Sequence, residues 1–214
     1  VALTKRPDVV AYSPAMRTLV SRLERVAGDD VTVLLVAEPG SEITSLARMV
    51  HETSGRHEAP FIEAACQDVP ADDALGALVG SRKGPGLLEL AGQGTLVLYD
   101  VPALSADAQR ALAEALSERR ARRLHGGPSY PLEARIVVSA RTGLAPLVLS
   151  GAIVAELARW LEPAACDVPP LRERREDVES LVLKALDRSA RLSGRHVLGV
   201  APDAMATIVR VATV

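Results

Sequence analysis

The sequence predicts an α/β fold in which a parallel sheet lies between two layers of helices, followed by the start of a small all-helical unit. Short apolar runs rich in β-branched residues alternate about five times with amphipathic stretches, as is typical of a parallel sheet with crossover helices. After Pro169-Pro170 the pattern becomes wholly helical. We therefore expect an α/β core over residues 1–168 and a partial helical lid over residues 169–214, in a piece of a longer protein.

The expected helices and strands can be placed along the chain from their local sequence patterns. Ser13 is placed to cap a first helix with Pro14 at its first position, and Gly28 with the two following aspartates ends it. Five short apolar segments bounded by turn residues are predicted strands: residues 32–37, 60–64, 95–99, 135–139 and 165–168. Apolar residues at helical spacing predict the remaining helices: residues 44–53, 72–79, 87–91, a helix capped at Ser105, 144–149, 153–161, 178–193 and 202–211.

Composition excludes several classes of protein. The 25 Lys+Arg and 27 Asp+Glu leave a net charge of −2, which argues against a dedicated nucleic-acid or membrane surface. Aromatic residues make up only 2%, so a site that stacks bases is not expected. Cys66 and Cys166 have no metal-ligand spacing and are expected to be core residues of a reducing compartment. With no apolar run long enough for a membrane helix, we expect a cytoplasmic protein.

The first strand and the next helix are joined by a turn where a phosphate-binding loop, G-x-x-x-x-G-K-[ST], would lie. The eight positions of this turn are Ala37, Glu38, Pro39, Gly40, Ser41, Glu42, Ile43 and Thr44. Pro39 has no N–H, Glu42 puts a carboxylate where phosphate oxygens would lie, and Ile43 replaces the lysine. Only Gly40 and Thr44 match the motif. These residues alone favour an ordinary strand-to-helix turn.

Several segments resemble one family when taken together. The most specific is the ten-residue run PPLRERREDV, residues 169–178, and others lie in the same order along the whole chain. They are Ser13-Pro14-Ala15-Met16, Val33-Leu34-Leu35, Ala47-Arg48 with His51, Ser54-Gly55-Arg56, Pro60-Phe61, Gly94-Thr95-Leu96-Val97-Leu98 and Gln109. This pattern resembles the AAA+ domain of bacterial sigma-54-dependent transcriptional activators, the enhancer-binding proteins. The resemblance implies a P-loop α/β/α core with a five-stranded parallel sheet, and a helical lid.

The sequence departs from that family where the family hydrolyses ATP. The Walker B acid pair is replaced by Tyr99-Asp100, so that one acid remains. Val154 and Trp160 occupy the arginine-finger positions, and Arg159 lies beside them but out of register. Ala140-Arg141 replaces the polar sensor pair. Phosphoryl transfer depends on charged groups of the kind that these replacements remove, and an arginine finger alone raises its rate about 10³-fold or more. We therefore expect no enzymatic activity.

The loop through which the family contacts sigma-54 is also missing. It should follow residues 80–84, but the chain continues directly to Pro85 and Gly86, so sigma-54 contact is doubtful. We expect a non-hydrolysing interaction or oligomerisation module of a transcriptional regulator. Its expected partners are proteins, either itself or an intact AAA+ homologue, with no direct binding of nucleic acid or membrane. The family implies ATP and Mg²⁺, but the altered turn and Asp100 are expected to hold no cofactor.

Alternative interpretations stay open beside this one. The chain could bind ATP in order to assemble, or retain weak ATPase activity in transcription activation. It could also regulate an intact homologue by joining a mixed ring. His51 and His57 have no ligand spacing, so no metal site is expected. The basic run from Glu118 to Arg123 is interpreted as a solvated helix end in preference to its alternative, a nucleic-acid contact, and Trp160 as a core or subunit-interface residue.

Overall fold

The five expected strands form one parallel sheet in the structure, a computed structural model that describes residues 9–194 and 197–212. Across the sheet the order is β2-β3-β6-β1-β7. The strands are β1 (Val33–Val36), β2 (Phe61–Ala65), β3 (Thr95–Tyr99), β6 (Arg135–Ala140) and β7 (Ala165–Asp167). The prediction of a five-stranded parallel sheet is confirmed, and β1 lies between β6 and β7.

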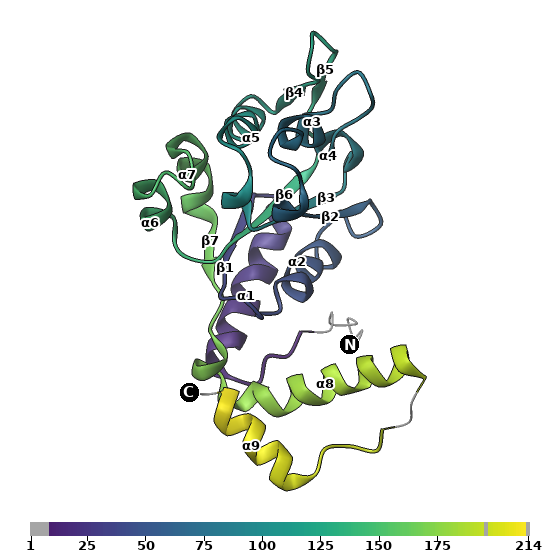
Figure 1. Cartoon of the computed structure of the whole chain (residues 1–214), viewed down its shortest axis with the longest axis vertical. Helices are drawn as coiled ribbons and strands as arrows, with labels where there is room; N and C mark the ends of the chain where they lie inside the picture. The colour runs from purple at the N-terminus through teal and green to yellow at the C-terminus, as the bar shows by residue number, and fades with distance from the viewer. Residues whose placement is uncertain (1–8, 195–196, 213–214) are drawn as a thin grey trace.

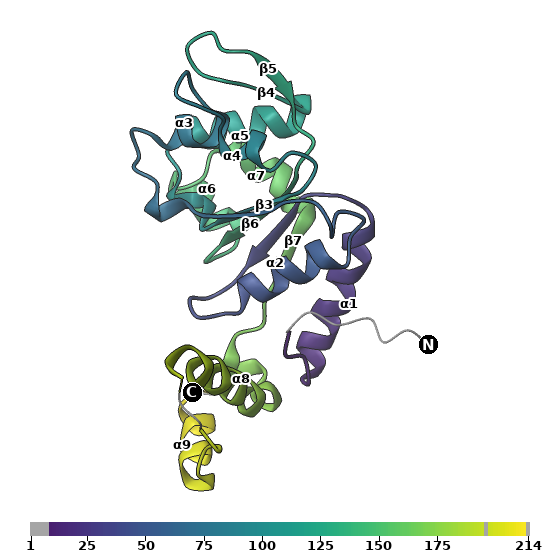
Figure 2. The same ribbon diagram turned by 90° about the vertical axis from the view of Figure 1, so that its right-hand side faces the viewer.

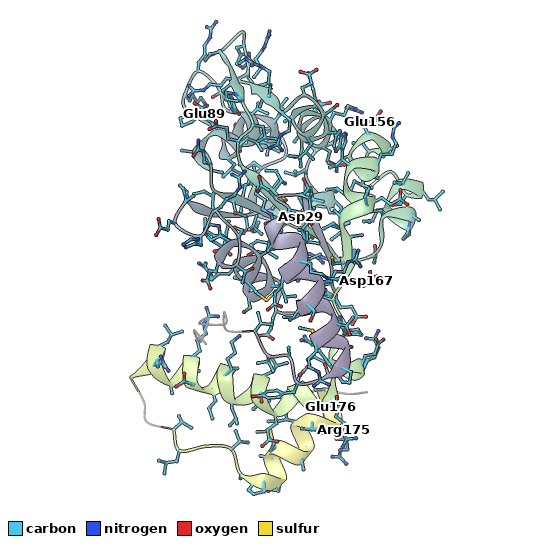
Figure 3. All side chains as sticks on the ribbon, turned by 180° about the vertical axis from the view of Figure 1, so that it is seen from behind. Asp29, Glu89, Glu156, Asp167, Arg175 and Glu176 are labelled. Carbon is cyan, nitrogen blue, oxygen red and sulfur yellow. The ribbon has the colours of Figure 1, made fainter. Side chains whose placement is uncertain are left out.

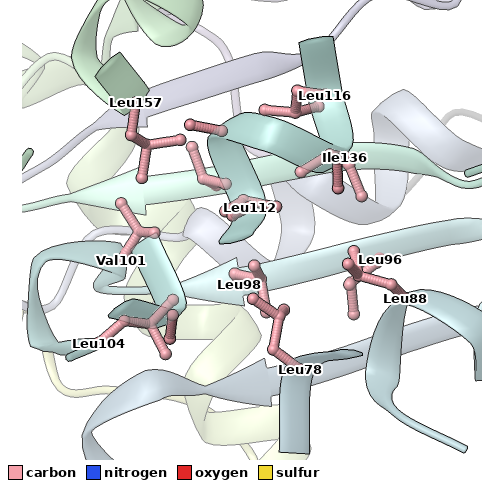
Figure 4. Close-up of a cluster of buried hydrophobic side chains, with 14 of the residues drawn as sticks. Leu78, Leu88, Leu96, Leu98, Val101, Leu104, Leu112, Leu116, Ile136 and Leu157 are labelled. Atoms are coloured by element: carbon pink, nitrogen blue, oxygen red, sulfur yellow. The ribbon is translucent and has the colours of Figure 1, made fainter. Parts of the chain in front are cut away.

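Alternating side chains of the strands build a separate core on each face of the sheet. Val33 and Leu35 of β1 pack with α1 (Pro14–Gly28) and α2 (Ile43–Glu52), while Leu34 faces the opposite way. The opposite core contains residues of α3 (Ala74–Val79), α4 (Leu87–Leu90), α5 (Ala106–Glu118) and α7 (Ala155–Leu161). Leucines and valines dominate this cluster (Figure 4). The helix α6 (Leu144–Leu149) precedes α7, and the layers lie on either side of the sheet in Figures 1 and 2.

The C-terminal part consists of α8 (Arg175–Ser193) and α9 (Pro202–Ala212), which pack on each other. Helix α8 begins three residues before the expected residue 178. Asp177 in its first turn is fully buried and accepts hydrogen bonds from the Ser13 N–H at 2.9 Å and the Ser13 hydroxyl at 2.7 Å. It also accepts one from the Tyr12 N–H. This carboxylate therefore joins the start of α8 to the N-cap of α1.

The run from Glu118 to Arg123 is not a helix end, and that interpretation is wrong. Helix α5 ends at Glu118, Arg119 follows in the left-handed conformation with φ 52°, and β4 (Arg120–Arg122) begins at once. This strand pairs antiparallel with β5 (Ser129–Pro131), far from the main sheet (Figure 1). Ala121 is buried while Arg120 and Arg122 are exposed, as expected for a hairpin with one face on the core.

Candidate functional site

The turn between β1 and α2 uses much of its own hydrogen-bonding capacity internally. The Ser41 N–H donates to the Glu38 carbonyl at 3.2 Å, and the Ile43 N–H donates to the Ser41 carbonyl at 2.9 Å. The Ala37 N–H donates to the Ala140 carbonyl of β6. A phosphate-binding loop aims its N–H groups at the ligand, whereas here three of them are already bonded to backbone.

Glu42 stands at the N-terminus of α2, and its carboxylate is bound by the helical lid. The Lys184 ammonium of α8 donates to one oxygen at 2.7 Å, and the Arg174 guanidinium lies 4.0 Å from the other. The positive end of a helix dipole favours an anion at this place. The chain thus places a carboxylate of its own at the N-terminus of α2, paired with a cation of α8.

Glu38 forms a second link from the turn to the lid. The Arg172 guanidinium donates to both oxygens of its carboxylate at 2.8 Å, a two-pronged pairing. This hydrogen bonding lowers the pKa of Glu38. Both carboxylates of the turn are therefore bound by cations that lie beyond Pro170.

Arg174 is buried, with 1% of its surface exposed, yet its guanidinium makes no hydrogen bond to the residues that the structure describes. Burial lowers the pKa of Arg174, and the nearby Glu42 carboxylate opposes that shift. The 4.0 Å separation from Glu42 is too long for a hydrogen bond. Arg174 also lines an open cavity of 1390 Å³ between the turn and α8, together with Gly40, Ser41 and Thr44.

Asp100, the acid that follows β3 at the position aligned with Walker B, forms an ion pair. The Arg141 guanidinium lies 2.8 Å from the Asp100 carboxylate, and the Asp100 N–H donates to the Ser139 hydroxyl. The neighbouring Tyr99 hydroxyl donates to Glu63 at 2.5 Å, and burial followed by this bond raises the pKa of Tyr99. At the two positions aligned with the Walker B pair, Tyr99 is therefore hydrogen-bonded to Glu63, and Asp100 is paired with Arg141.

Three further expected features are located by the structure. Trp160 of α7 is 46% exposed, so of its two interpretations the core residue is wrong and the subunit-interface residue stays a prediction. It lines a shallow cavity of 660 Å³ with Arg159 and residues of α5. Val154 is the N-cap of α7, and its half-buried side chain packs against the hydrophobic core. The arginine-finger positions therefore carry no guanidinium, and the nearest one belongs to Arg159.

The chain between α3 and α4 turns back without a projecting loop. Ser81 and Gly84 exchange backbone hydrogen bonds at 3.0 and 3.2 Å, which leaves Arg82 and Lys83 at the tip of the turn. The turn therefore lies at residues 81–84, just before Pro85 and Gly86. A side chain at Gly86 would come within 2.2 Å of the Gly80 nitrogen, so the two ends of the turn are held close together.

Of the histidines and cysteines considered above, His51, Cys66 and Cys166 are buried and His57 is exposed. His51 is 4% exposed and its Nδ1 lies 2.9 Å from the Thr95 hydroxyl, and burial lowers its pKa. The exposed His57 faces the Ser54 carbonyl instead. Both cysteines are buried and free, as expected, and burial raises the pKa of Cys66 to about 12. Across residues 9–194 and 197–212, no group of three His, Cys, Asp or Glu side chains could hold a metal, and no helix could span a membrane.

Comparison with known proteins identifies relatives of most of the chain. Residues 9–165 match the family described as Sigma-54 interaction domain. The transcriptional regulatory protein XylR of Pseudomonas putida is 32% identical over 92% of this chain and 36% of its own length. A Nif-specific regulatory protein of Rhizobium leguminosarum bv. trifolii is 31% identical over 90% of this chain and 58% of its own. The chain spans between a third and three fifths of the length of these two relatives.

Solved structures are similar over nearly the same region. The structure of NtrX from Brucella abortus in complex with ADP has a TM-score of 0.86 and 27% identity, covering 94% of this chain and 46% of NtrX. The complex of the same protein with ATP is equally similar, at 28% identity. The P-loop NTPase domain of an Escherichia coli sigma-54 activator has the same fold, with a TM-score of 0.57 and 22% identity over 76% of this chain and 99% of its own.

Proposed function

The chain belongs to the family of sigma-54 interaction domains, and we propose that within this family it is a non-hydrolysing module that acts through protein contacts. The observation that carries the proposal is the Glu42 carboxylate at the N-terminus of α2, bound by Lys184 of the lid at 2.7 Å. A nucleotide would have to displace this ion pair and bring its phosphates against a carboxylate. At about 4 Å, two like charges at an effective dielectric constant of 20 repel by about 4 kcal/mol.

The surrounding charges support the absence of hydrolysis. Ile43 offers no cation to a terminal phosphate, and it packs instead with the core beneath α2. The Asp100 carboxylate is already paired with Arg141, so an incoming Mg²⁺ would have to compete with a guanidinium. Catalysis of phosphoryl transfer relies on a lysine, a metal and a finger acting together. With all three altered, the site retains the shape of the family's site without its chemistry.

The role in protein contacts is supported by the exposed face of α7. Trp160 is a large aromatic side chain with 46% of its surface exposed, beside the 660 Å³ cavity that Arg159 also lines. Exposed tryptophan and arginine are the residue types that contribute most to protein interfaces. We propose that this face contacts another protein, either a second copy of the chain or an intact relative, as part of a transcriptional regulator.

A second candidate function is favoured by one specific observation. The buried Arg174 guanidinium has no hydrogen-bond partner among the described residues and lines the 1390 Å³ cavity. Buried polar groups are normally hydrogen-bonded, so this side chain would be stabilised by an anion. ATP bound there without turnover, promoting assembly, is the alternative that this arginine supports.

Isothermal titration calorimetry with ATP and Mg²⁺ separates the two candidates. For the first, we expect no heat of binding up to millimolar nucleotide. Binding tighter than roughly millimolar, lost in Arg174→Gln and kept in Arg175→Gln, would support the second candidate and contradict the first. Arg175 is the matched control because it is an exposed arginine next in the chain. Inorganic phosphate, titrated in parallel, shows whether a bare anion is sufficient.

A further inference from the structure

The end of the molecule farthest from α8 carries a cluster of exposed cations. It combines the turn between α3 and α4 with the β4–β5 hairpin, and we call it the basic tip: Arg82, Lys83, Arg119, Arg120 and Arg122. The two segments are adjacent, because the Leu124 N–H donates to the Gly80 carbonyl at 3.0 Å and the Arg82 guanidinium reaches the His125 carbonyl at 3.5 Å. Nitrogen-ended side chains project from this end in Figure 3.

These five charges have no carboxylate partner among the described residues, although Arg82 and Arg120 make long hydrogen bonds to the His125 carbonyl at 3.5 Å and to the Ser129 hydroxyl at 3.4 Å. Across the described ranges, none of them has a carboxylate within ion-pair distance, whereas Arg123 beside them is bound by Glu89 at 2.6 and 2.7 Å. Of the nearby acids, Glu89 is therefore occupied, and the exposed Glu118 is a single charge at the end of α5. Only Arg119 stands at a helix end, so the helix dipole does not explain Arg120 and Arg122 on β4.

The basic tip lacks the features of an interface that buries apolar surface. None of the exposed large apolar side chains that the structure describes lies within residues 80–86 or 119–131. Tyr130 is half-buried, and its hydroxyl donates to the Val79 carbonyl, so its ring is not free to stack on a base. What remains is a set of guanidinium and ammonium groups, suited to a backbone of regularly spaced phosphates.

We propose that the basic tip binds the phosphate backbone of double-stranded DNA without sequence preference. A two-stranded β-ribbon fits the major groove of B-form DNA, whereas the major groove of A-form RNA is deep and narrow. Arg120 and Arg122 lie on the same exposed face of such a ribbon, about 7 Å apart along the strand. The proposal replaces the expectation of no nucleic-acid contact, which rested on the net charge of the whole chain and on the interpretation of the run as a helix end, whereas β4 begins at Arg120.

The test measures fluorescence anisotropy of a labelled 20-base-pair DNA duplex of mixed sequence, titrated with the chain at several salt concentrations. We expect a Kd between about 1 and 100 µM at ~50 mM salt, with a slope of log K against log salt as steep as roughly −4.5 for five phosphate contacts. Arg120→Gln with Arg122→Gln should weaken binding at least tenfold and make the slope shallower by about 2 units.

A matched control removes two exposed arginines from α1, which is not part of the basic tip. Arg22→Gln with Arg25→Gln on α1 changes the net charge equally and should alter Kd by less than twofold. Circular dichroism checks folding, and Arg82→Gln with Lys83→Gln provides an independent variant if the hairpin variant unfolds. Failure of the chain to bind DNA at low salt would overturn the proposal. An equal loss of DNA affinity in the Arg120/Arg122 variant and in the Arg22/Arg25 variant would also overturn it.

Two further arms distinguish DNA from other polyanions. A 20-base-pair RNA duplex should bind at least fivefold more weakly, and polyglutamate of equal charge should compete poorly. Equal binding of the RNA or of polyglutamate would contradict the assignment to duplex DNA. The result is independent of the proposed function, because the basic tip and the Glu42 site share no residue.

Discussion

At the scale of single residues, Glu42 and Ile43 oppose nucleotide binding for different reasons. Restoring the lysine alone, Ile43→Lys, leaves the Glu42 carboxylate in place, where it repels phosphates and pairs with the new lysine. We therefore expect Ile43→Lys to bind no fluorescent ATP analogue at millimolar concentration. Glu42→Gly combined with Ile43→Lys should bind, since glycine at a helix N-cap costs only a few tenths of a kcal/mol.

Glu42→Gly alone is the control for this pair, because it removes the carboxylate without adding a cation. It also frees the Lys184 ammonium from the contact at 2.7 Å. Binding by the single Ile43→Lys variant as tight as that of the double variant would show that the Glu42 argument is wrong.

A second residue, Asp177, is expected to hold the lid to the core. Replacing it with alanine leaves two backbone N–H groups and the Ser13 hydroxyl without their acceptor in a buried place. We expect a loss of about 3 kcal/mol in the free energy of unfolding, measured with urea. Glu176→Ala is the matched control, since Glu176 is exposed and should change stability by less than about 0.5 kcal/mol. Equal losses in both variants would mean that the buried contacts do not carry the effect.

The sequence was sufficient to identify the altered residues of the turn, but not what binds them. Glu42 and Ile43 stand out because a motif assigns a residue type to each position. The lysine that binds Glu42 is 142 residues further along the chain, and no local pattern links the two. Arg174 likewise lies in a run of alternating charges, where nothing distinguishes the one arginine that the fold buries.

At the scale of elements, the missing loop between α3 and α4 has a spatial consequence. Ser81 and Gly84 close the turn and Gly80 lies close to Gly86, so the few residues between them form a short turn with no projecting segment. We expect purified sigma-54 not to be retained by the immobilised chain in a pull-down without DNA. An intact activator with an ATP transition-state analogue is the positive control. Retention comparable to that control, and lost in Arg82→Ala with Lys83→Ala, would show that the turn still makes the contact.

The hairpin of β4 and β5 shows where element prediction failed. Its strands have three residues each, and exposed arginines flank the single buried Ala121. A strand of three residues shows too little alternation between buried and exposed side chains to be distinguished from the charged end of the preceding helix. Apart from that alternation, the sequence signal of a hairpin was the turn-forming pair Gly126-Gly127. The strands of the main sheet were easier to predict, because burial on both faces makes them continuous apolar runs.

At the scale of the whole molecule, the chain has the fold of its family, and we propose that the charges of the site differ from those of a working ATPase. The sheet, the capped first helix and the lid contacts through Asp177 depend on burial and backbone hydrogen bonds, which the changes in the turn leave intact. The carboxylates Glu38, Glu42 and Asp100 are each paired with a cation of the same chain. A domain built in this way can keep its shape without a nucleotide, and the central proposal is that it does not hydrolyse ATP.

The release of phosphate from ATP and Mg²⁺ tests that claim most directly. It should be measured over a range of protein concentrations, so that any site completed by a second copy is also detected. We expect no release above the buffer blank at any concentration. Release that disappears in Asp100→Ala, and persists in the exposed control Asp107→Ala, would contradict the account.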